Sequence, residues 1–164
     1  MIRIFGIDPG LRITGYAAVD LRHGELEPVL VEGGVIRLDA RLPMEDRLEQ
    51  LHRELAELLD ALKPEHVAVE KLYAHYNHPR TAILMSHARG VILLCARQRE
   101  LAVEHLPSTE VKKAMTGYGH ASKEQMQRAV QSQCRLASPP SPPDVADAIA
   151  IAMTAARRLA VARL

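Results

Sequence analysis

The chain opens with MIRIFGIDPG (residues 1–10), an apolar run that stops at an Asp-Pro-Gly turn signal. An apolar run rich in β-branched residues predicts a buried strand, and the Pro-Gly pair predicts its end. Such a strand would leave Asp8 at its carboxyl end, where ligands gather in open α/β sheets. An aspartate in this position can also serve only to bond the backbone of its own turn. The choice between these two interpretations depends on whether other carboxylates reach the same edge.

The composition predicts a globular protein of one domain, covering residues 1–164. Apolar residues make up 48% of the chain and charged residues 25%. There is no run of about 18 apolar residues that would span a membrane, and no signal-peptide pattern, so we expect a cytoplasmic protein. Cys95 and Cys134 lie outside any metal-ligand spacing and are expected to be small core residues in a reducing compartment.

The net charge of +1 does not by itself indicate a nucleic-acid partner, but the charges are unevenly distributed. Acidic residues predominate in residues 38–65, and basic residues predominate from Lys71 onward. A nearly neutral protein with one basic face can bind a polyanion. Two ordinary solvated helix faces would produce the same pattern, so charge alone leaves both readings open.

The first half of the chain predicts three strands, a helix and a fourth strand. Residues 11–20 and 28–38 follow the first strand through short links, which favours an antiparallel meander. Gly33-Gly34 suggests a bulge in the third strand. Leucines spaced by three and four predict a helix over residues 43–62. The next strand, residues 66–70, should run parallel to the first, because a helix connects them.

The second half continues with a polar loop, a long helix and a further strand. The loop, residues 71–79, is polar and carries two of the five aromatic residues of the chain. A helix is predicted over residues 80–100, and Gly90 at its centre suggests close packing of another helix, since glycine there costs about 1 kcal/mol against alanine. Residues 101–106 form the fifth predicted strand.

Three more helices complete the predicted order. Ser108 or Thr109 can cap a short helix. Residues 122–125 fit a capping box that opens the next helix. The last helix is predicted from Asp144 to about Leu159.

Carboxylates recur at the ends of these elements. If the first and fourth strands are neighbours, Asp8 and Glu70 face each other at one edge of the sheet. Asp144 and Asp147 share one face at the start of the last helix, where the helix dipole favours ionised carboxylates. Asp144 could be a helix cap and nothing more. Asp147 lies on an otherwise apolar stripe, and a buried carboxylate without a partner is costly.

A metal ion would relieve that cost. The candidate site therefore consists of Asp8, Glu70, Asp144 and Asp147, without the Cys or His spacing of a zinc site. All-carboxylate ligation suits Mg²⁺ or Mn²⁺. Two such ions roughly 3.5–4 Å apart form the clamp used for in-line phosphoryl displacement. A nearby lysine, Lys112 or Lys123, could balance charge developing on the phosphate.

Four segments of the chain resemble the RuvC family of Holliday junction resolvases, within the RNase H-like superfamily. They are GIDPGLRITGYA, VAVEKLYAHYNHPRTAILMSHARGVILLCA, VKKAMTGYGHASKEQMQ and DVADAIAIA, and together they extend over nearly the whole chain. The resemblance implies an α/β, RNase H-like fold with a mixed five-stranded sheet, an antiparallel meander followed by parallel strands, flanked by helices. It also implies that the four carboxylates are the catalytic, metal-binding residues.

The resemblance further implies how DNA and partners are bound. Lys112 and Lys123 match basic residues near the scissile phosphate, and Lys113 and Arg80 join them as expected DNA-binding residues. Tyr73 stands where the family has an aromatic residue that engages a base at the junction centre; the familiar bacterial members have Phe there. The family is homodimeric through helices that include the segment matching residues 80–100 here. It cuts two opposed strands of a four-way DNA junction symmetrically, leaving ligatable nicks with 5′-phosphate and 3′-hydroxyl ends, and it works with the RuvA–RuvB branch-migration complex.

Three other classes of protein share parts of this pattern. An actin-like or sugar-kinase-like ATP-binding domain also opens with a strand and Asp-x-Gly, but it needs a second phosphate loop, which this sequence lacks. A YqgF-type RNase H-like nuclease would keep the chemistry and act on RNA or another nucleic acid. A non-catalytic junction-binding protein would have no need for all four carboxylates.

Overall fold

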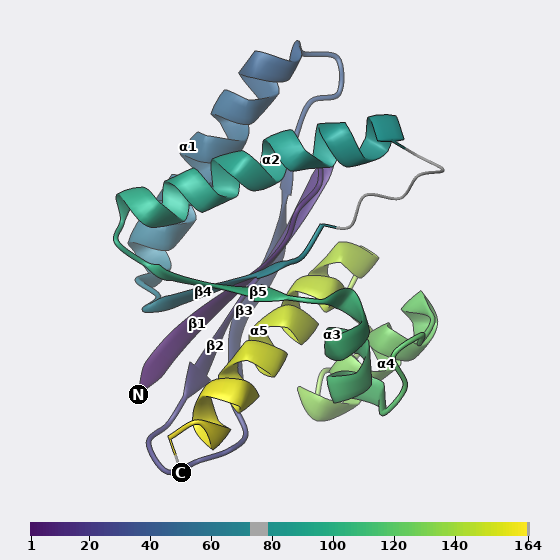
Figure 1. Cartoon of the computed structure of the whole chain (residues 1–164). Helices are drawn as coiled ribbons and strands as arrows, with labels where there is room; N and C mark the ends of the chain where they lie inside the picture. The colour runs from purple at the N-terminus through teal and green to yellow at the C-terminus, as the bar shows by residue number, and fades with distance from the viewer. Residues whose placement is uncertain (73–78, 164) are drawn as a thin grey trace.

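The computed structural model describes residues 1–72 and 79–163, in which a five-stranded sheet lies between two layers of helices (Figure 1). The strands are β1 (Ile2–Asp8), β2 (Ile13–Leu21), β3 (Val29–Arg37), β4 (His66–Glu70) and β5 (Ala102–Leu106). The helices are α1 (Met44–Leu62), α2 (Pro79–Gln98), α3 (Ser108–Thr116), α4 (Lys123–Gln133) and α5 (Pro143–Val161). The predicted order of elements is confirmed, with bounds that differ by one or two residues.

The sheet is mixed, in the strand order β3-β2-β1-β4-β5. β1, β2 and β3 pair antiparallel, as a meander with short links must. β1, β4 and β5 pair parallel, because helices connect them in sequence. The predicted α/β class and the change from antiparallel to parallel pairing are therefore confirmed, and β1 and β4 are neighbours.

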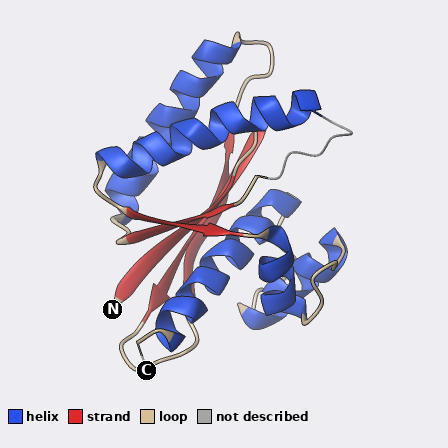
Figure 2. Cartoon of the chain, viewed as in Figure 1, coloured by secondary structure: helices blue, strands red, loops and turns tan. Residues whose placement is uncertain are grey.

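Helices cover both faces of the sheet. α1 and α2 lie together over one face, while α5, with α3 and α4 beside it, lies over the other (Figures 1 and 2). Both chain ends lie at the same end of the molecule in Figure 1. Because side chains alternate along a strand, each face has its own apolar core. On β1, Phe5 and Ile7 enter the core under α1 and α2, whereas Ile4 enters the core under α5.

α5 packs unusually close to the sheet because glycines lie beneath it. A Cβ atom at Gly6 of β1 would overlap the main-chain oxygen of Ala148. A Cβ atom at Gly15 of β2 would overlap the main-chain oxygen of Asp144. Only a hydrogen side chain leaves room for the helix backbone at this separation, so these two glycines set how near the first turns of α5 come to β1 and β2.

The bulge expected in the third strand is present, but its predicted position at Gly33-Gly34 was wrong. Both glycines pair in regular register, and the shift occurs opposite Ala18/Val19, where Val31 is the extra residue of β3. The glycines provide space instead. A Cβ atom at Gly34 would lie 2.7 Å from the Tyr16 hydroxyl, so the Tyr16 ring needs a glycine beside it.

Two helix features also depart from the sequence prediction. The N-cap of α3 is Pro107, and neither Ser108 nor Thr109 caps the helix through its side chain. Gly90 of α2 faces open space, so the close helix contact expected there does not occur within the described chain. The capping box between Ser122 and Gln125 is confirmed, with both of its hydrogen bonds present.

Both cysteines are free: Cys95 is buried and Cys134 packs partly buried against the core under α5. Among the described helices, none has the length and apolar character needed to cross a membrane.

Candidate active site

Two carboxylates stand at adjacent strand ends. β1 and β4 pair parallel with Ile7 opposite Val69, so Asp8 and Glu70 follow at the same edge. Alternation also places them on one face: Ala68 belongs to the core under α5, and Glu70, two residues later, points the same way. Asp8 shares the parity of Ile4, which enters that same core. Both side chains are therefore directed toward α5.

The first turns of α5 supply the other two carboxylates. Pro142 is the N-cap and Pro143 the first helical residue, so Asp144 lies inside the first turn and makes no capping hydrogen bond. This weakens the reading of Asp144 as a simple cap. Asp147 lies one turn further on the same face, and the contact of Asp144 with Gly15 holds this end of the helix on the sheet beside Asp8, which pairs with Gly15.

The electrostatics identify the four carboxylates as one cluster. Burial raises the pKa of Asp8 well above its ordinary value, and the negative charges of Asp147, Glu70 and Asp144 raise it further. The positive charge of Lys123 partly opposes this rise. Strong mutual repulsion among partly desolvated carboxylates is the arrangement that a bound cation relieves.

The pKa values of two other members are shifted in the same direction. Burial and the charge of Asp147 raise the pKa of Glu70, against the opposing effect of Lys112 and of a hydrogen bond from Ser108. Burial raises the pKa of Asp147, against the opposing effect of Lys123, while Asp144 adds repulsion and Lys112 relieves it. Two lysines thus face a cluster of four carboxylates.

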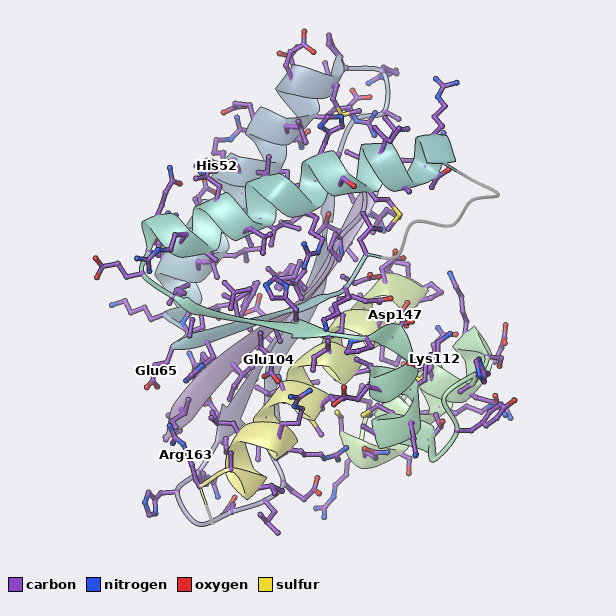
Figure 3. The ribbon with its side chains drawn as sticks, viewed as in Figure 1. His52, Glu65, Glu104, Lys112, Asp147 and Arg163 are labelled. Atoms are coloured by element: carbon purple, nitrogen blue, oxygen red, sulfur yellow. The ribbon has the colours of Figure 1, made fainter. Side chains whose placement is uncertain are left out.

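The predicted basic residues do not all reach this cluster. Lys112 of α3 lies beside Asp147 of α5 in Figure 3, in agreement with its effect on the Asp147 pKa. Lys123, the first residue of α4, is exposed and close enough to act on Asp8 and Asp147. Lys113 and Arg80 are exposed and are not among the groups that shift the pKa of the carboxylates. Tyr73 lies outside the described residues.

A cavity of about 220 Å³ opens beside the strand ends. Its lining consists of Asp8, Pro9, Glu70, Lys71, Leu72, Met85, Arg89 and Ser108. Two members of this lining were not expected from the sequence. Ser108 was expected only as a helix cap but donates a hydrogen bond to Glu70, and no role at the site was expected for Arg89. No local pattern would have identified either, because each approaches Glu70 only through the packing of α2 and α3.

The donor set suits a hard divalent cation. All four groups offer carboxylate oxygens, the ligands that Mg²⁺ and Mn²⁺ take, and their charges repel one another without a cation. Within residues 1–72 and 79–163, no three acidic, histidine or cysteine side chains converge closely enough to hold one ion in their present rotamers. The backbone thus gathers the donors at one edge of the sheet, and a shared ion would require their side chains to rotate toward it.

Comparison with known proteins gives a consistent result. The family model described as crossover junction endodeoxyribonuclease RuvC matches residues 4–155. A RuvC from Rhodopirellula baltica is 47% identical over 150 residues, which are 92% of this chain and 83% of that protein. One from Brevibacillus brevis is 41% identical over 156 residues, 95% of this chain and 92% of that protein.

Solved structures agree with the sequence comparison. RuvC of T. thermophilus, in complex with a Holliday junction substrate, superposes with a TM-score of 0.89 at 31% identity, covering 99% of this chain and 97% of that one. The yeast mitochondrial Holliday junction resolvase Ydc2, at 13% identity and a TM-score of 0.66, covers 99% of this chain and 85% of that one and shares the fold. Because the family model extends over most of the chain and these relatives match nearly its full length, the chain belongs to the RuvC family of crossover junction endodeoxyribonucleases.

Proposed function

We propose that this protein is a single-domain endonuclease that resolves Holliday junctions in DNA recombination and repair. It hydrolyses one phosphodiester in each of two opposed strands and leaves 5′-phosphate and 3′-hydroxyl ends. The observation that carries this proposal is the gathering of four carboxylates on one sheet edge, within a chain of the RuvC family. The relative solved in complex with a Holliday junction substrate has the same fold over nearly the whole chain.

RuvC proteins are metal-dependent nucleases. For this chain we propose Mg²⁺ or Mn²⁺, two per subunit when DNA is bound, held by Asp8, Glu70, Asp144 and Asp147. Ions so held would supply an acidified water as nucleophile and stabilisation of the leaving 3′ oxygen. Since burial and repulsion raise the pKa of Asp8, protons compete with the metal for this carboxylate, and metal affinity should rise with pH.

Positive side chains have separate roles in this proposal. Lys112 and Lys123 lower the pKa values of carboxylates in the cluster, and this proximity supports assigning them the neutralisation of the reacting phosphate. Lys113 and Arg80 are exposed and would contact the DNA backbone further out. Such contacts make binding salt-sensitive and largely independent of sequence, so junction shape governs recognition. Tyr73 is proposed to stack on a base at the junction centre, on the resemblance alone.

A dimer fits the outer face of α2. Ile83 is 60% exposed and Leu94 is 55% exposed, and Gly90 between them faces open space. These three residues are spaced by seven and four, which places them on one face of the helix. We propose that two subunits pair through this face. A twofold axis would then present two active sites to the two equivalent strands of a junction.

Two further features rest on the family resemblance. We propose that the protein works in the cytoplasm, and that it receives its junctions from the RuvA–RuvB branch-migration complex. Copurification of the three proteins on a synthetic junction would test the partnership.

The decisive experiment compares a synthetic four-way junction with a linear duplex and a single strand of the same sequence, each with Mg²⁺, Mn²⁺ or EDTA. We expect metal-dependent paired nicks in opposed strands of the junction alone. Asp147→Asn should abolish cleavage and keep junction binding within about threefold, because it removes a carboxylate from the cluster and leaves the basic surface intact. Cutting of single strands or RNA would instead support a YqgF-type nuclease, and binding without cutting under any metal would support a non-catalytic junction-binding protein.

A further inference from the structure

Arg89 links three elements at the carboxyl end of β4. It projects from α2, and its Nε donates a hydrogen bond of 3.2 Å to the main-chain oxygen of Glu70, the last residue of β4. Its Nη2 donates to Nδ1 of His105 on β5. One guanidinium thus joins α2, β4 and β5 at the point where a carboxylate of the active site leaves the sheet. The planar fork of arginine suits such a two-way contact.

The surroundings of Arg89 indicate a fixed side chain. It lines the cavity that Asp8 and Glu70 also line, and burial lowers its pKa. His105 must accept this hydrogen bond at Nδ1, so its ring is neutral with the proton on Nε2. Burial and the charges of Arg89 and Lys71 lower the pKa of His105, which favours this neutral ring.

The charge of Arg89 is not what balances the carboxylates. The positive groups that shift the pKa of Asp8 and Glu70 are Lys123 and Lys112 respectively, and Arg89 is not among them. The guanidinium reaches the main chain of Glu70 and not its carboxylate. Its contribution is therefore to hold backbone geometry, a role distinct from that of the two lysines.

We propose that Arg89 is a positioning residue that fixes the main chain at Glu70 and thereby sets the metal affinity of the carboxylate cluster. This inference rests on the metal site of the proposed function. After Glu70 the strand ends: the Lys71 amide still donates to the main-chain oxygen of Leu106 at 2.8 Å, and within the described residues β4 has no paired residue beyond Glu70. With the Glu70 carbonyl tied to α2, the carboxylate starts from a fixed Cα position. Groups that orient metal ligands in this way change metal affinity or activity by about 10–100-fold when they are removed.

The test measures metal binding directly, by calorimetric titration of Mn²⁺ into the protein without DNA. We expect about tenfold weaker Mn²⁺ binding in Arg89→Ala. Arg89→Lys should bind Mn²⁺ nearly as weakly, because a single ammonium group cannot reproduce the contacts with both Glu70 and His105. Arg97→Ala, which removes an exposed arginine from the same helix, should bind Mn²⁺ like the wild type. Junction affinity in EDTA should stay within about twofold of wild type in all three variants.

His105→Ala provides a variant that does not threaten folding, since His105 is exposed. It frees one end of Arg89, so Mn²⁺ binding should weaken by about threefold. The double variant, with both Arg89→Ala and His105→Ala, should bind Mn²⁺ no more weakly than Arg89→Ala alone, because the two residues act as one unit. If the losses of Mn²⁺ affinity in the two single variants add in the double variant, Arg89 and His105 do not act as a pair.

Two outcomes separate this inference from the proposed function. If the wild type binds Mn²⁺ and cuts junctions while folded Arg89→Ala does both equally well, the positioning role is wrong and the proposed function stands. Weaker junction affinity in EDTA with unchanged Mn²⁺ binding would also overturn the inference and make Arg89 a DNA contact. If the wild type neither binds Mn²⁺ nor cuts, the proposed function itself fails.

Discussion

At the scale of single residues, the site stores unfavourable electrostatic energy in the metal-free protein. The pKa values of Asp8, Glu70 and Asp147 are all raised by burial, and repulsion adds to each rise. A carboxyl with a raised pKa binds its proton more tightly in the folded state, so its ionisation costs stability. The stability that the protonated carboxyl contributes is fully present below the ordinary carboxyl pKa of about 4. It is lost as the pH rises through the raised pKa of the folded state. A bound cation would favour the ionised carboxylates and so offset this loss of stability.

Asp8→Asn should therefore stabilise the metal-free protein while it abolishes cleavage. The neutral amide removes the charge that repels the other three carboxylates. We expect a gain of about 0.5–2 kcal/mol in the free energy of unfolding near pH 7.5, the range typical of a single stabilising substitution. The gain should shrink toward pH 4, where the wild-type carboxyl is protonated. Urea unfolding at both pH values, with EDTA present, measures this difference.

Asp39→Asn is the matched control, because the pKa of Asp39 is lowered in the folded protein whereas that of Asp8 is raised. Asp39 is only partly buried, and a hydrogen bond from Arg41 lowers its pKa to about 2. Its ionised form is favoured in the folded state, so the substitution should not stabilise the protein at neutral pH. Equal stability of Asp8→Asn and the wild type at both pH values would contradict the account of the carboxylate cluster.

At the scale of elements, the position of α5 decides whether the four carboxylates meet. The sheet supplies two of them and the helix the other two, so the distance between the layers sets the geometry of the site. That distance is set where glycines leave room for the helix backbone, and Gly15 lies directly against the Asp144 main chain. The apolar residues of α5 then bury this helix between the sheet, α3 and α4.

Gly15→Ala tests this dependence. The added methyl group would overlap the Asp144 main chain, so the first turn of α5 must move outward. Overpacking of this kind costs about 1–3 kcal/mol, and we expect an unfolding midpoint several degrees lower. Cleavage should fall at least tenfold, because Asp144 and Asp147 move with the helix. Junction cleavage and thermal unfolding of the purified variant measure both effects; a variant with wild-type activity would show that the close approach is not needed.

At the scale of the whole molecule, the proposed dimer explains an otherwise unfavourable surface. α2 exposes Ile83 and Leu94 to solvent on either side of Gly90, which costs helix stability and at which an added Cβ atom would meet no other atom of the described chain. Close approach of a second copy of α2 would use all three features together. The junction-cutting geometry would then follow from the symmetry axis.

Leu94→Glu should break this dimer. A buried charge without a partner is costly at a subunit interface, so we expect sedimentation at micromolar concentration to show a monomer. Paired nicking of one junction should give way to single nicks, since the two sites are no longer linked. Val161→Glu places the same charge at another exposed apolar position, 63% exposed at the end of α5, and should leave the dimer intact. A wild-type protein that sediments only as a monomer would refute the proposed interface.

The sequence by itself determined the elements and the candidate carboxylates. Strand ends, helix periodicity and the Pro-Pro boundary are local signals, and they placed Asp8, Glu70, Asp144 and Asp147 on the right elements because side-chain parity and helix phase depend on neighbours in the chain. Family resemblance then indicated their role. Local signals were misleading where packing decides: Gly33-Gly34 resembled a bulge, although its glycines accommodate the Tyr16 ring and α5.

Only the tertiary structure decided which groups surround the carboxylates. Lys112 and Lys123 reach the cluster while Lys113 does not, a distinction that depends on how α3 and α4 are oriented against α5. Ser108 and Arg89 approach Glu70 from helices that lie on opposite faces of the sheet. These contacts join residues distant in sequence, and no pattern within one segment encodes them. Their energies depend on distance and desolvation, which exist only once the layers have packed.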